Sequence, residues 1–321
     1  MLASKKAQKG KRFKENTARF NFNIESELLR LQRELINLTY RPGRYKRFVV
    51  YESKKRLISA APYRDRVVHH ALCNVIEPIF DKTFIYDSYA NRQEKGTHKA
   101  IQRFTDFSRK NEYVLKCDIV KYFDSIDKRV LFNVIAKKIK DEKVLWLVGK
   151  ILEIDRESLF SVNDMGLPIG NLTSQFFANL YLNGFDHFIK ENLRCRYYVR
   201  YVDDFVILGN DKSRLHKIKS YVEEYLARIG LQVHSKKTQI FPVEQGTEFL
   251  GFKIFPTHRR VRKSNYYHFS RRLKRMQRVY HHNRNMNTFR DISQSVRSWI
   301  AHVSWGDTWG LRKKLFSEVE F

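Results

Sequence analysis

The apolar positions of the chain repeat with a helical period in some stretches and with a strand period in others. Leu28, Leu31, Leu35 and Leu38 recur at spacings of three and four, which predicts a helix over residues 24–38. The same kind of pattern predicts helices over 65–80 (closing before Pro78), 128–150, 172–193 and 213–229. The last seventy residues are predicted to be helical and very basic, and the basic, polar residues 1–20 to form a flexible arm.

Shorter apolar runs predict strands. Residues 47–58 form two such runs around a Lys-Lys-Arg turn, which indicates a basic hairpin, and single strands are expected over 113–119, 231–233 and 249–254. The run from Tyr197 to Leu208 surrounds Asp203 and Asp204, so it is expected to fold as strand, turn, strand with two carboxylates at the tip. This order predicts an α+β fold, an antiparallel sheet backed by helices.

The charge of the chain points to a polyanionic partner. Lys and Arg number 62 against 34 Asp and Glu, a net charge of +28, and nucleic acid is the usual partner of so basic a protein. A basic surface that serves solubility or acidic lipid is the alternative. The sequence has room for two or three subdomains around one sizeable core.

Cysteine usage and hydropathy bear on location. Cys73, Cys117 and Cys195 are widely spaced with no CxxC pair, so reduced, buried thiols are expected instead of a zinc site or disulfides. No secretory signal and no run of 18 apolar residues is seen, so a cytoplasmic protein without membrane contact is expected.

The acids on the predicted strands suggest a metal site. Asp118 ends one strand, and Asp203 and Asp204 lie on the hairpin tip, so the three carboxylates could converge. Phosphoryl transfer to a nucleotide needs two divalent ions about 3.5–4 Å apart, and Mg²⁺ prefers carboxylate and phosphate oxygens. Two Mg²⁺ ions are expected, with Mn²⁺ as a possible substitute. The alternative is a solvated Asp-Asp turn with an unrelated Asp118.

Several segments could contact an incoming nucleotide. Phe123 could pack under the sugar and exclude a 2′-hydroxyl, and Lys237 could lie near the leaving pyrophosphate. A loop that opens a helix could form the floor of the site, and hairpin cations could clamp a triphosphate. These candidates are Ile169, Gly170 and Gln175 of the loop, and Lys54, Arg56 and Arg66 of the hairpin region. For each, a core or solvated role is the alternative.

Other cations could contact nucleic acid. The turn around Arg92 and Lys95 suits backbone contact with a template or nucleotide. The basic C-terminal helices suit a duplex backbone, through Arg271, Arg272, Lys274 and Arg275.

Taken in order, these segments resemble the conserved blocks of reverse transcriptases. The blocks run from the hairpin cations through Ser88-Tyr89-Ala90, Asp118 to Phe123, Gly166 to Gln175, Tyr201-Val202-Asp203-Asp204 and Gly230 to Thr238 to Phe249-Leu250-Gly251, over about residues 45–255. The resemblance implies a right-hand polymerase that binds dNTPs, template RNA and the RNA/cDNA duplex. It also implies a catalytic metal site at Asp118, Ile119, Asp203 and Asp204.

The same resemblance implies a division into domains. Residues 1–44 would form a basic arm and helix, and 45–110 the fingers, with about 128–170 interleaved. Residues 111–127 and 171–255 would form the palm, and 256–321 a short helical basic thumb.

One residue, Ile169, narrows the resemblance to a subgroup of reverse transcriptases. Many reverse transcriptases have Gln where Ile169 precedes Gly170, and the Ile variant resembles the enzymes of diversity-generating retroelements. Those enzymes copy a template-repeat RNA with errors opposite adenine and act with a small basic oligomeric accessory protein. A retron-like or defence-associated reverse transcriptase, and an RNA-binding protein with a vestigial polymerase site, are the alternatives.

Overall fold

The computed structural model describes residues 1–51, 55–154 and 164–317. Its centre is a four-stranded antiparallel sheet with the strand order β4-β5-β3-β6. The strands are β3 (Tyr113–Asp118), β4 (Tyr198–Tyr201), β5 (Asp204–Gly209) and β6 (Gln239–Pro242). Side chains from both faces of the sheet are buried, which explains why these strands are apolar at nearly every position instead of at alternate ones.

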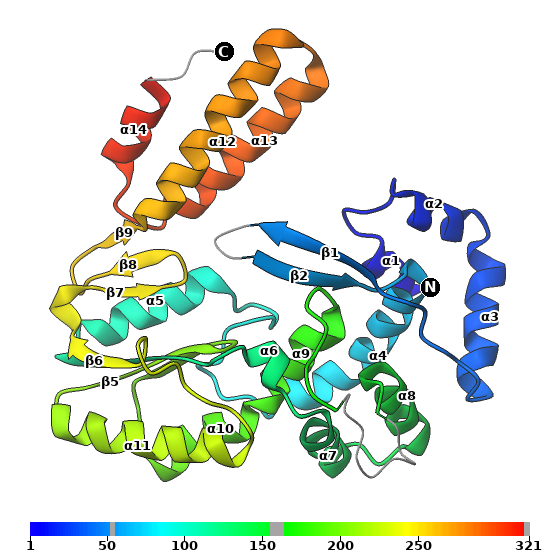
Figure 1. Ribbon diagram of the computed structural model, residues 1–321, viewed down its shortest axis with the longest axis horizontal. Coiled ribbons are helices and arrows are strands. Elements are labelled where there is room, and N and C mark those ends of the chain that lie inside the picture. The colour runs from blue at the N-terminus through cyan, green and yellow to red at the C-terminus, as the bar shows by residue number, and fades with distance from the viewer. Residues whose placement is uncertain (52–54, 155–163, 318–321) are drawn as a thin grey trace.

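Helices cover one face of this sheet, and a helix with a second sheet covers the other (Figure 1). Leu115, Phe205 and Ile207 pack in the larger core against the helices, while Val114 and Val206 pack in the smaller one. The first layer is α9 (Leu172–Tyr181), α10 (Asn183–His187) and α11 (Lys212–Arg228). The second is α5 (Thr97–Ser108) with β7 (Thr247–Phe249), β8 (Phe252–Ile254) and β9 (Arg259–Val261).

The N-terminal region is folded, so the prediction of a flexible arm over residues 1–20 was wrong. Helices α1 (Leu2–Ala7), α2 (Glu15–Phe22) and α3 (Ile24–Ile36) form a cluster with α4 (Tyr63–Asp81). Ala3 and Ala7, four residues apart, let α1 approach α4 closely. The hydroxyl of Tyr63 donates a hydrogen bond to the carbonyl oxygen of the fully buried Ser4 at 3.1 Å.

Helix α4 also runs further than predicted, because it continues through Pro78 to Asp81. A proline inside a helix removes a backbone hydrogen bond and costs roughly 3 kcal/mol. Leu72, Ile76 and Phe80 on one side of α4 are all buried in the main core. Their burial offsets the cost of the proline, which local propensity alone does not indicate.

The basic hairpin is present as β1 (Lys46–Tyr51) and β2 (Lys55–Ala60), and it projects over the sheet edge (Figure 1). The helix predicted over 128–150 is instead two helices, α7 (Lys128–Lys138) and α8 (Glu142–Leu152). Ile139 is extended, and the carboxylate of Asp141 caps α8 by accepting from the N–H of Val144. The short helix α6 (Tyr122–Ser125) follows β3.

Three further predictions needed correction. The helix expected over 172–193 is divided into α9, α10 and the π-helical turn η1 (Phe188–Asn192). The residues 231–233 contribute only a bridge between Val233 and Ile119. The strand expected over 249–254 is a tight hairpin, because Leu250 and Gly251 both have positive φ. The structure also contains α5, β9 and the 3-10 turn η2 (Val243–Gln245), which were not predicted.

The C-terminal region is helical, as predicted. It comprises α12 (Lys263–His282), α13 (Met286–Val303) and α14 (Trp309–Ser317), which lie beyond the second sheet (Figure 1). Its small core contains Phe269, Leu273, Trp299, Val303 and Leu315. Among the described residues, no helix is long and apolar enough to cross a bilayer. All three cysteines are buried and free, as expected.

Candidate active site

Strand register brings the predicted carboxylates to one edge of the central sheet. Asp118 at the end of β3 is the direct antiparallel partner of Asp204 at the start of β5. Side chains of such a pair lie on the same face, with Cβ atoms about 4.5–5.5 Å apart. Asp203 lies in the turn of the β4–β5 hairpin, where Tyr201 pairs with Asp204. Register and the hairpin turn therefore place the three acids at the same edge of the sheet, and their role as metal ligands stays a prediction.

The carboxylate of Asp204 is not fully compensated by the protein. Its Oδ1 atom is buried and accepts no hydrogen bond from the described residues. Burial raises the pKa of Asp204 to about 7, and the neighbouring Asp203 and Asp118 add to this effect while Lys116 opposes it. Burial also raises the pKa of Asp203. Because a bound cation would reverse this cost, the acids form a candidate metal site.

Two cations approach these acids from different elements. The ammonium of Lys237 contacts Oδ2 of Asp118, and it belongs to a turn fixed by a 2.7 Å hydrogen bond from the N–H of His234 to the carbonyl of Asp118. Arg56 is exposed on β2 and is close enough to Asp203 to lower its pKa. The positions of Lys237 and Arg56 suit contact with the phosphates of a nucleotide.

The loop before α9 connects the hairpin to the segment after β3. The N–H of Leu167 donates to the carbonyl of Phe123 at 2.8 Å, and the carbonyl of Ile169 accepts from the N–H of Ser59 at 2.9 Å. Gly170 has φ +115°, and a Cβ there would meet Ile58 at 2.9 Å, so glycine is needed. The loop thus links the segment after β3 to β2 through its backbone, while Gln175 is exposed on α9, and nucleotide contact by these residues stays a prediction.

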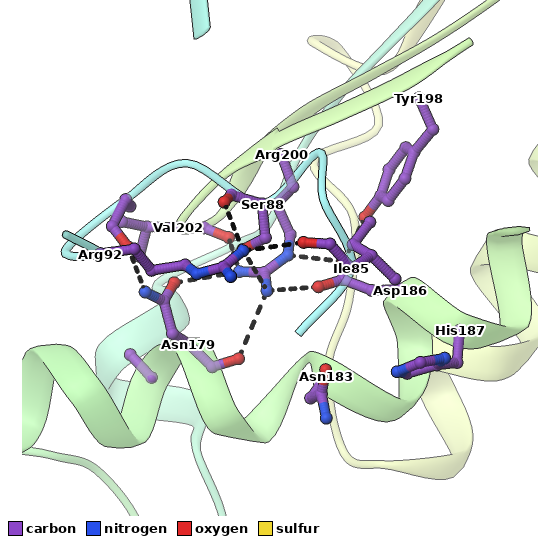
Figure 2. A network of polar contacts seen from close by, with 12 residues as sticks. Ile85, Ser88, Arg92, Asn179, Asn183, Asp186, His187, Tyr198, Arg200 and Val202 are labelled. Carbon is purple, nitrogen blue, oxygen red and sulfur yellow. Dashed lines mark hydrogen bonds and ion pairs between the residues drawn. The ribbon is translucent and has the colours of Figure 1, made fainter. Parts of the chain in front are cut away.

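Three of the predicted phosphate or nucleic-acid contacts have other surroundings in the structure. Arg92 donates to Asp81 Oδ1 at 2.6 Å. It also donates to the carbonyls of Ile85 and Ser88 (Figure 2). Lys95 donates to the carbonyl of Tyr86 and lies 3.3 Å from the centre of its ring. Both stabilise the turn before α5, and their contact with nucleic acid stays a prediction.

Arg66 lies half-buried on α4, 5.3 Å from the ring centre of Tyr63. Burial lowers the pKa values of Lys11 and His70, and the nearby charge of Arg66 adds to both shifts. Arg66 is therefore set among the N-terminal helices, away from the residues that shift the pKa of Asp203. Lys54 lies outside the described residues.

The predicted C-terminal cations lie together on α12. All four are exposed: Arg271, Arg272, Lys274 and Arg275. They surround Leu273, which is buried in the core of the C-terminal helices. This arrangement keeps the charges available for a polyanion.

Sequence reasoning missed a buried charge network beneath the acidic turn. Arg200 on β4 is fully buried and pairs with the equally buried Asp186 at 2.5 Å (Figure 2). Its Nη1 atom donates to the carbonyl of Val202 at 3.1 Å and to Oδ1 of Asn179 at 3.2 Å. The available signal was an arginine inside an apolar strand two residues before the acidic turn.

The donor set fits a hard divalent cation. Carboxylate oxygens at Asp118, Asp203 and Asp204 are the ligands that Mg²⁺ and Mn²⁺ prefer, and the side chain of Ile119 is buried and has no donor atom. Among the described residues, no three His, Cys, Asp or Glu side chains converge closely enough to enclose a metal ion.

Comparison with known families identifies the chain. Residues 46–254, more than half of it, match the family model described as reverse transcriptase (RNA-dependent DNA polymerase). The chain therefore belongs to the reverse transcriptase family, whose members generally use divalent metal ions.

Among curated proteins, the chain is 28% identical over 295 residues to Protein YkfC of Escherichia coli, covering 78% of this chain and 76% of that protein. It is 24% identical over 226 residues to the group II intron-encoded protein LtrA of Lactococcus lactis, covering 67% and 38% of the two chains. The relatives are thus of the bacterial and group II intron kind, and the chain spans well under two thirds of LtrA.

Solved structures support the fold. Apo telomerase from Candida tropicalis superposes with a TM-score of 0.53 at 15% identity, over 70% of this chain and 49% of that one. The telomerase of the same organism in complex with a fragment of telomeric RNA gives 0.53 at 14% identity, over 85% and 54%. The chain spans about half the length of these structures, and the likeness confirms a right-hand reverse transcriptase fold.

Proposed function

We propose that this chain is an RNA-directed DNA polymerase that extends a primer with dNTPs on an RNA template. The observation that carries the proposal is the edge of the central sheet. Three carboxylates lie at this edge, one with an oxygen atom that the described residues leave without a partner. Lys237 contacts Asp118 from the turn before β6, and Arg56 lies near Asp203 on β2. Two cations beside hard oxygen ligands match the charge of a metal-bound triphosphate.

Each element then has a role in the proposed enzyme. The central sheet is the palm, the β1–β2 hairpin with α7 and α8 belongs to the fingers, and α12 to α14 are the thumb. The carboxylates would hold two divalent ions, which activate the 3′-hydroxyl and stabilise the leaving pyrophosphate. Arg56 and Lys237 orient phosphates, and Phe123 lines the sugar side of the nucleotide.

The test is primer extension on an RNA template with dNTPs and Mg²⁺. The wild-type chain should make cDNA, and Asp203→Asn should abolish synthesis while its affinity for RNA stays within about twofold. Glu224→Gln, an isosteric change of an exposed acid on α11, is the matched control and should be fully active. RNA binding by the wild type without any cDNA would instead support the RNA-binding alternative.

The finer proposal is that this enzyme copies its template with errors opposite adenine, as part of a diversity-generating retroelement with a small basic accessory protein. Ile169 supports it. Its carbonyl accepts the hydrogen bond from Ser59, while its side chain is half-buried and has no polar atom that could order a nucleotide sugar. A glutamine there could donate and accept, so base selection is expected to loosen with isoleucine.

The intron-type relatives favour a second candidate, a more accurate bacterial reverse transcriptase that copies another RNA. Sequencing the cDNA of wild type, Ile169→Gln and the apolar control Ile169→Leu distinguishes the two. Errors opposite adenine that fall in Ile169→Gln and persist in Ile169→Leu support the mutagenic enzyme. Accurate cDNA from all three would leave the polymerase in place and favour the second candidate.

A further inference from the structure

The backbone of the acidic turn is strained. Val202, directly before Asp203, has φ +56°, in the left-handed region that a β-branched residue rarely adopts. Such a sparsely populated backbone conformation is unfavourable in free energy, so it persists only where surrounding contacts hold it. The orientation of Asp203 therefore depends on something that holds Val202.

A hydrogen bond from a buried cation reaches this residue. Nη1 of Arg200 donates to the carbonyl oxygen of Val202 at 3.1 Å (Figure 2). The guanidinium is itself fixed, because Nε donates to Asp186 Oδ1 at 2.7 Å and Nη2 to Asp186 Oδ2 at 2.5 Å. This bidentate geometry leaves the fork of the arginine little freedom.

The anchor extends into three other elements. Asp186 belongs to α10 and also accepts a hydrogen bond from the hydroxyl of Tyr198 at 2.7 Å. Asn179 of α9 accepts from Arg200 through Oδ1 and through its carbonyl. Ser88, in the loop before α5, accepts from Nη2 of Arg200 at 3.2 Å. The turn is thus tied to the helices below the sheet and to the loop beside it.

We infer that Arg200, held by Asp186, is a positioning residue that keeps Val202 in its left-handed conformation and so aims Asp203 at the metal ions. Lysine would keep the buried charge but could not reproduce the forked contacts to both Asp186 and Val202. The inference rests on the proposed polymerase activity. It goes further by assigning the geometry of the metal site to a pair that contacts neither metal nor substrate.

The first experiment compares wild type with Arg200→Lys in primer extension over a range of Mg²⁺ concentrations. We expect kcat to fall by about 10- to 100-fold, because small misplacements at a reacting centre have effects of that size, and the Mg²⁺ needed for half-maximal rate to rise several-fold. Affinity for primer–template should change by less than about twofold. Mn²⁺ binding, followed by EPR with a non-extendable primer and dNTP, should weaken in parallel without any turnover.

Three further variants separate positioning from stability. Ser88→Ala, the matched control, removes one hydrogen bond to Arg200 but leaves the one to Val202, so its Mg²⁺ requirement should match wild type. Glycine adopts positive φ freely, so Arg200→Lys should cost only a few-fold in a Val202→Gly background. Asn179→Ala removes the other acceptor of Nη1, the nitrogen that bonds Val202, whereas Ser88 contacts Nη2. It leaves the ion pair with Asp186 in place but also removes the hydrogen bond from the Asn179 amide to the carbonyl of Ala90. It should raise the Mg²⁺ requirement even if Arg200→Lys does not fold.

A lower melting temperature with unchanged kcat, Mg²⁺ requirement and Mn²⁺ binding in Arg200→Lys and Asn179→Ala would overturn the inference. So would an equal loss from Arg200→Lys with and without Val202→Gly. Failure of the wild type to make cDNA would instead contradict the proposed function. The Mn²⁺ titration would then still decide the inference.

Discussion

The hairpin formed by β4 and β5 contains two sets of buried charges that the protein treats in opposite ways. Arg200 and Asp186 are fully buried. The guanidinium of Arg200 donates hydrogen bonds to Asp186, Asn179, Val202 and Ser88. A few residues along the chain, Oδ1 of Asp204 is buried with no such partner among the described residues. Compensated charges serve the fold, whereas an uncompensated oxygen at a sheet edge marks a place for a ligand.

The largest expected effect comes from changing the uncompensated side. Asp204→Asn should lower kcat by about 1000-fold, corresponding to ~4 kcal/mol, because it removes one of the proposed metal ligands. The same change should raise the melting temperature of the metal-free protein at pH 8, since it removes a buried charge that lacks compensation. Primer extension and thermal unfolding in EDTA measure the two effects.

The test depends on the two quantities changing in opposite directions, with kcat falling while the melting temperature in EDTA rises. Loss of activity together with loss of stability in EDTA would mean that Asp204 is compensated in a way that resembles Asp186. Glu224→Gln serves again as the control for removing an acid, and it should leave both quantities unchanged.

Breaking the ion pair between Arg200 and Asp186 should have the next largest effect, on the stability of the fold. Asp186→Asn leaves the fully buried Arg200 without its ion-pair partner, which typically costs about 3–5 kcal/mol of the free energy of unfolding. Tyr198→Phe removes only one hydrogen bond to the same carboxylate and should cost about 1 kcal/mol. Urea unfolding at pH 7.5 measures both. Equal losses from the two variants would show that the ion pair itself contributes little.

The sequence predicts the three acids at the sheet edge better than it predicts the buried ion pair beneath them. Asp118, Asp203 and Asp204 were found because acids inside apolar strands are conspicuous, and register then made Asp118 and Asp204 neighbours. Arg200 and Asp186 escaped because their pairing depends on β4 facing α10, which no local pattern encodes.

Helix boundaries failed for a related reason. Burial of Leu72, Ile76 and Phe80 carries α4 through Pro78, and packing of Ala3 and Ala7 against α4 folds an arm whose composition is polar. In both cases tertiary contacts outweigh the local propensity. The hairpin at Leu250 and Gly251 was missed because a single glycine indicates a turn only weakly.

His69 tests whether any unpartnered buried atom indicates a ligand site. It is 2% exposed on α4, Nδ1 has no partner among the described residues, and burial lowers its pKa to about 4, with His70 adding to the effect. No acid is among the groups that shift it, in contrast to Asp204. We therefore expect His69 to affect stability and leave metal dependence unchanged.

The pH dependence follows from the sign of that shift. The unfolded chain binds a proton near pH 6.5 and the folded chain only near 4, so the stability is fully present above 6.5 and is lost as the pH falls toward 4. The loss should be on the order of 2 kcal/mol by pH 4.5. Urea unfolding of wild type and His69→Gln at pH 7.5 and 4.5 measures it. An equal decrease in both proteins would contradict the expectation.

The smallest effect is expected from exposed charges that form no ion pair with the residues that the structure describes. Arg271 and Lys274, three residues apart on α12, are exposed, so we expect each to release about one counterion from a bound duplex. Changing both to Gln should lower affinity for an RNA/DNA duplex at least about tenfold near 0.1 M salt and make the plot of log K against log salt shallower by about 1.8. Lys137 and Lys138, exposed on α7, form the matched control pair for the same titration. If both pairs change the slope equally, binding depends on net charge alone. If only the α12 pair changes it, the exposed cations of α12 contact the duplex backbone.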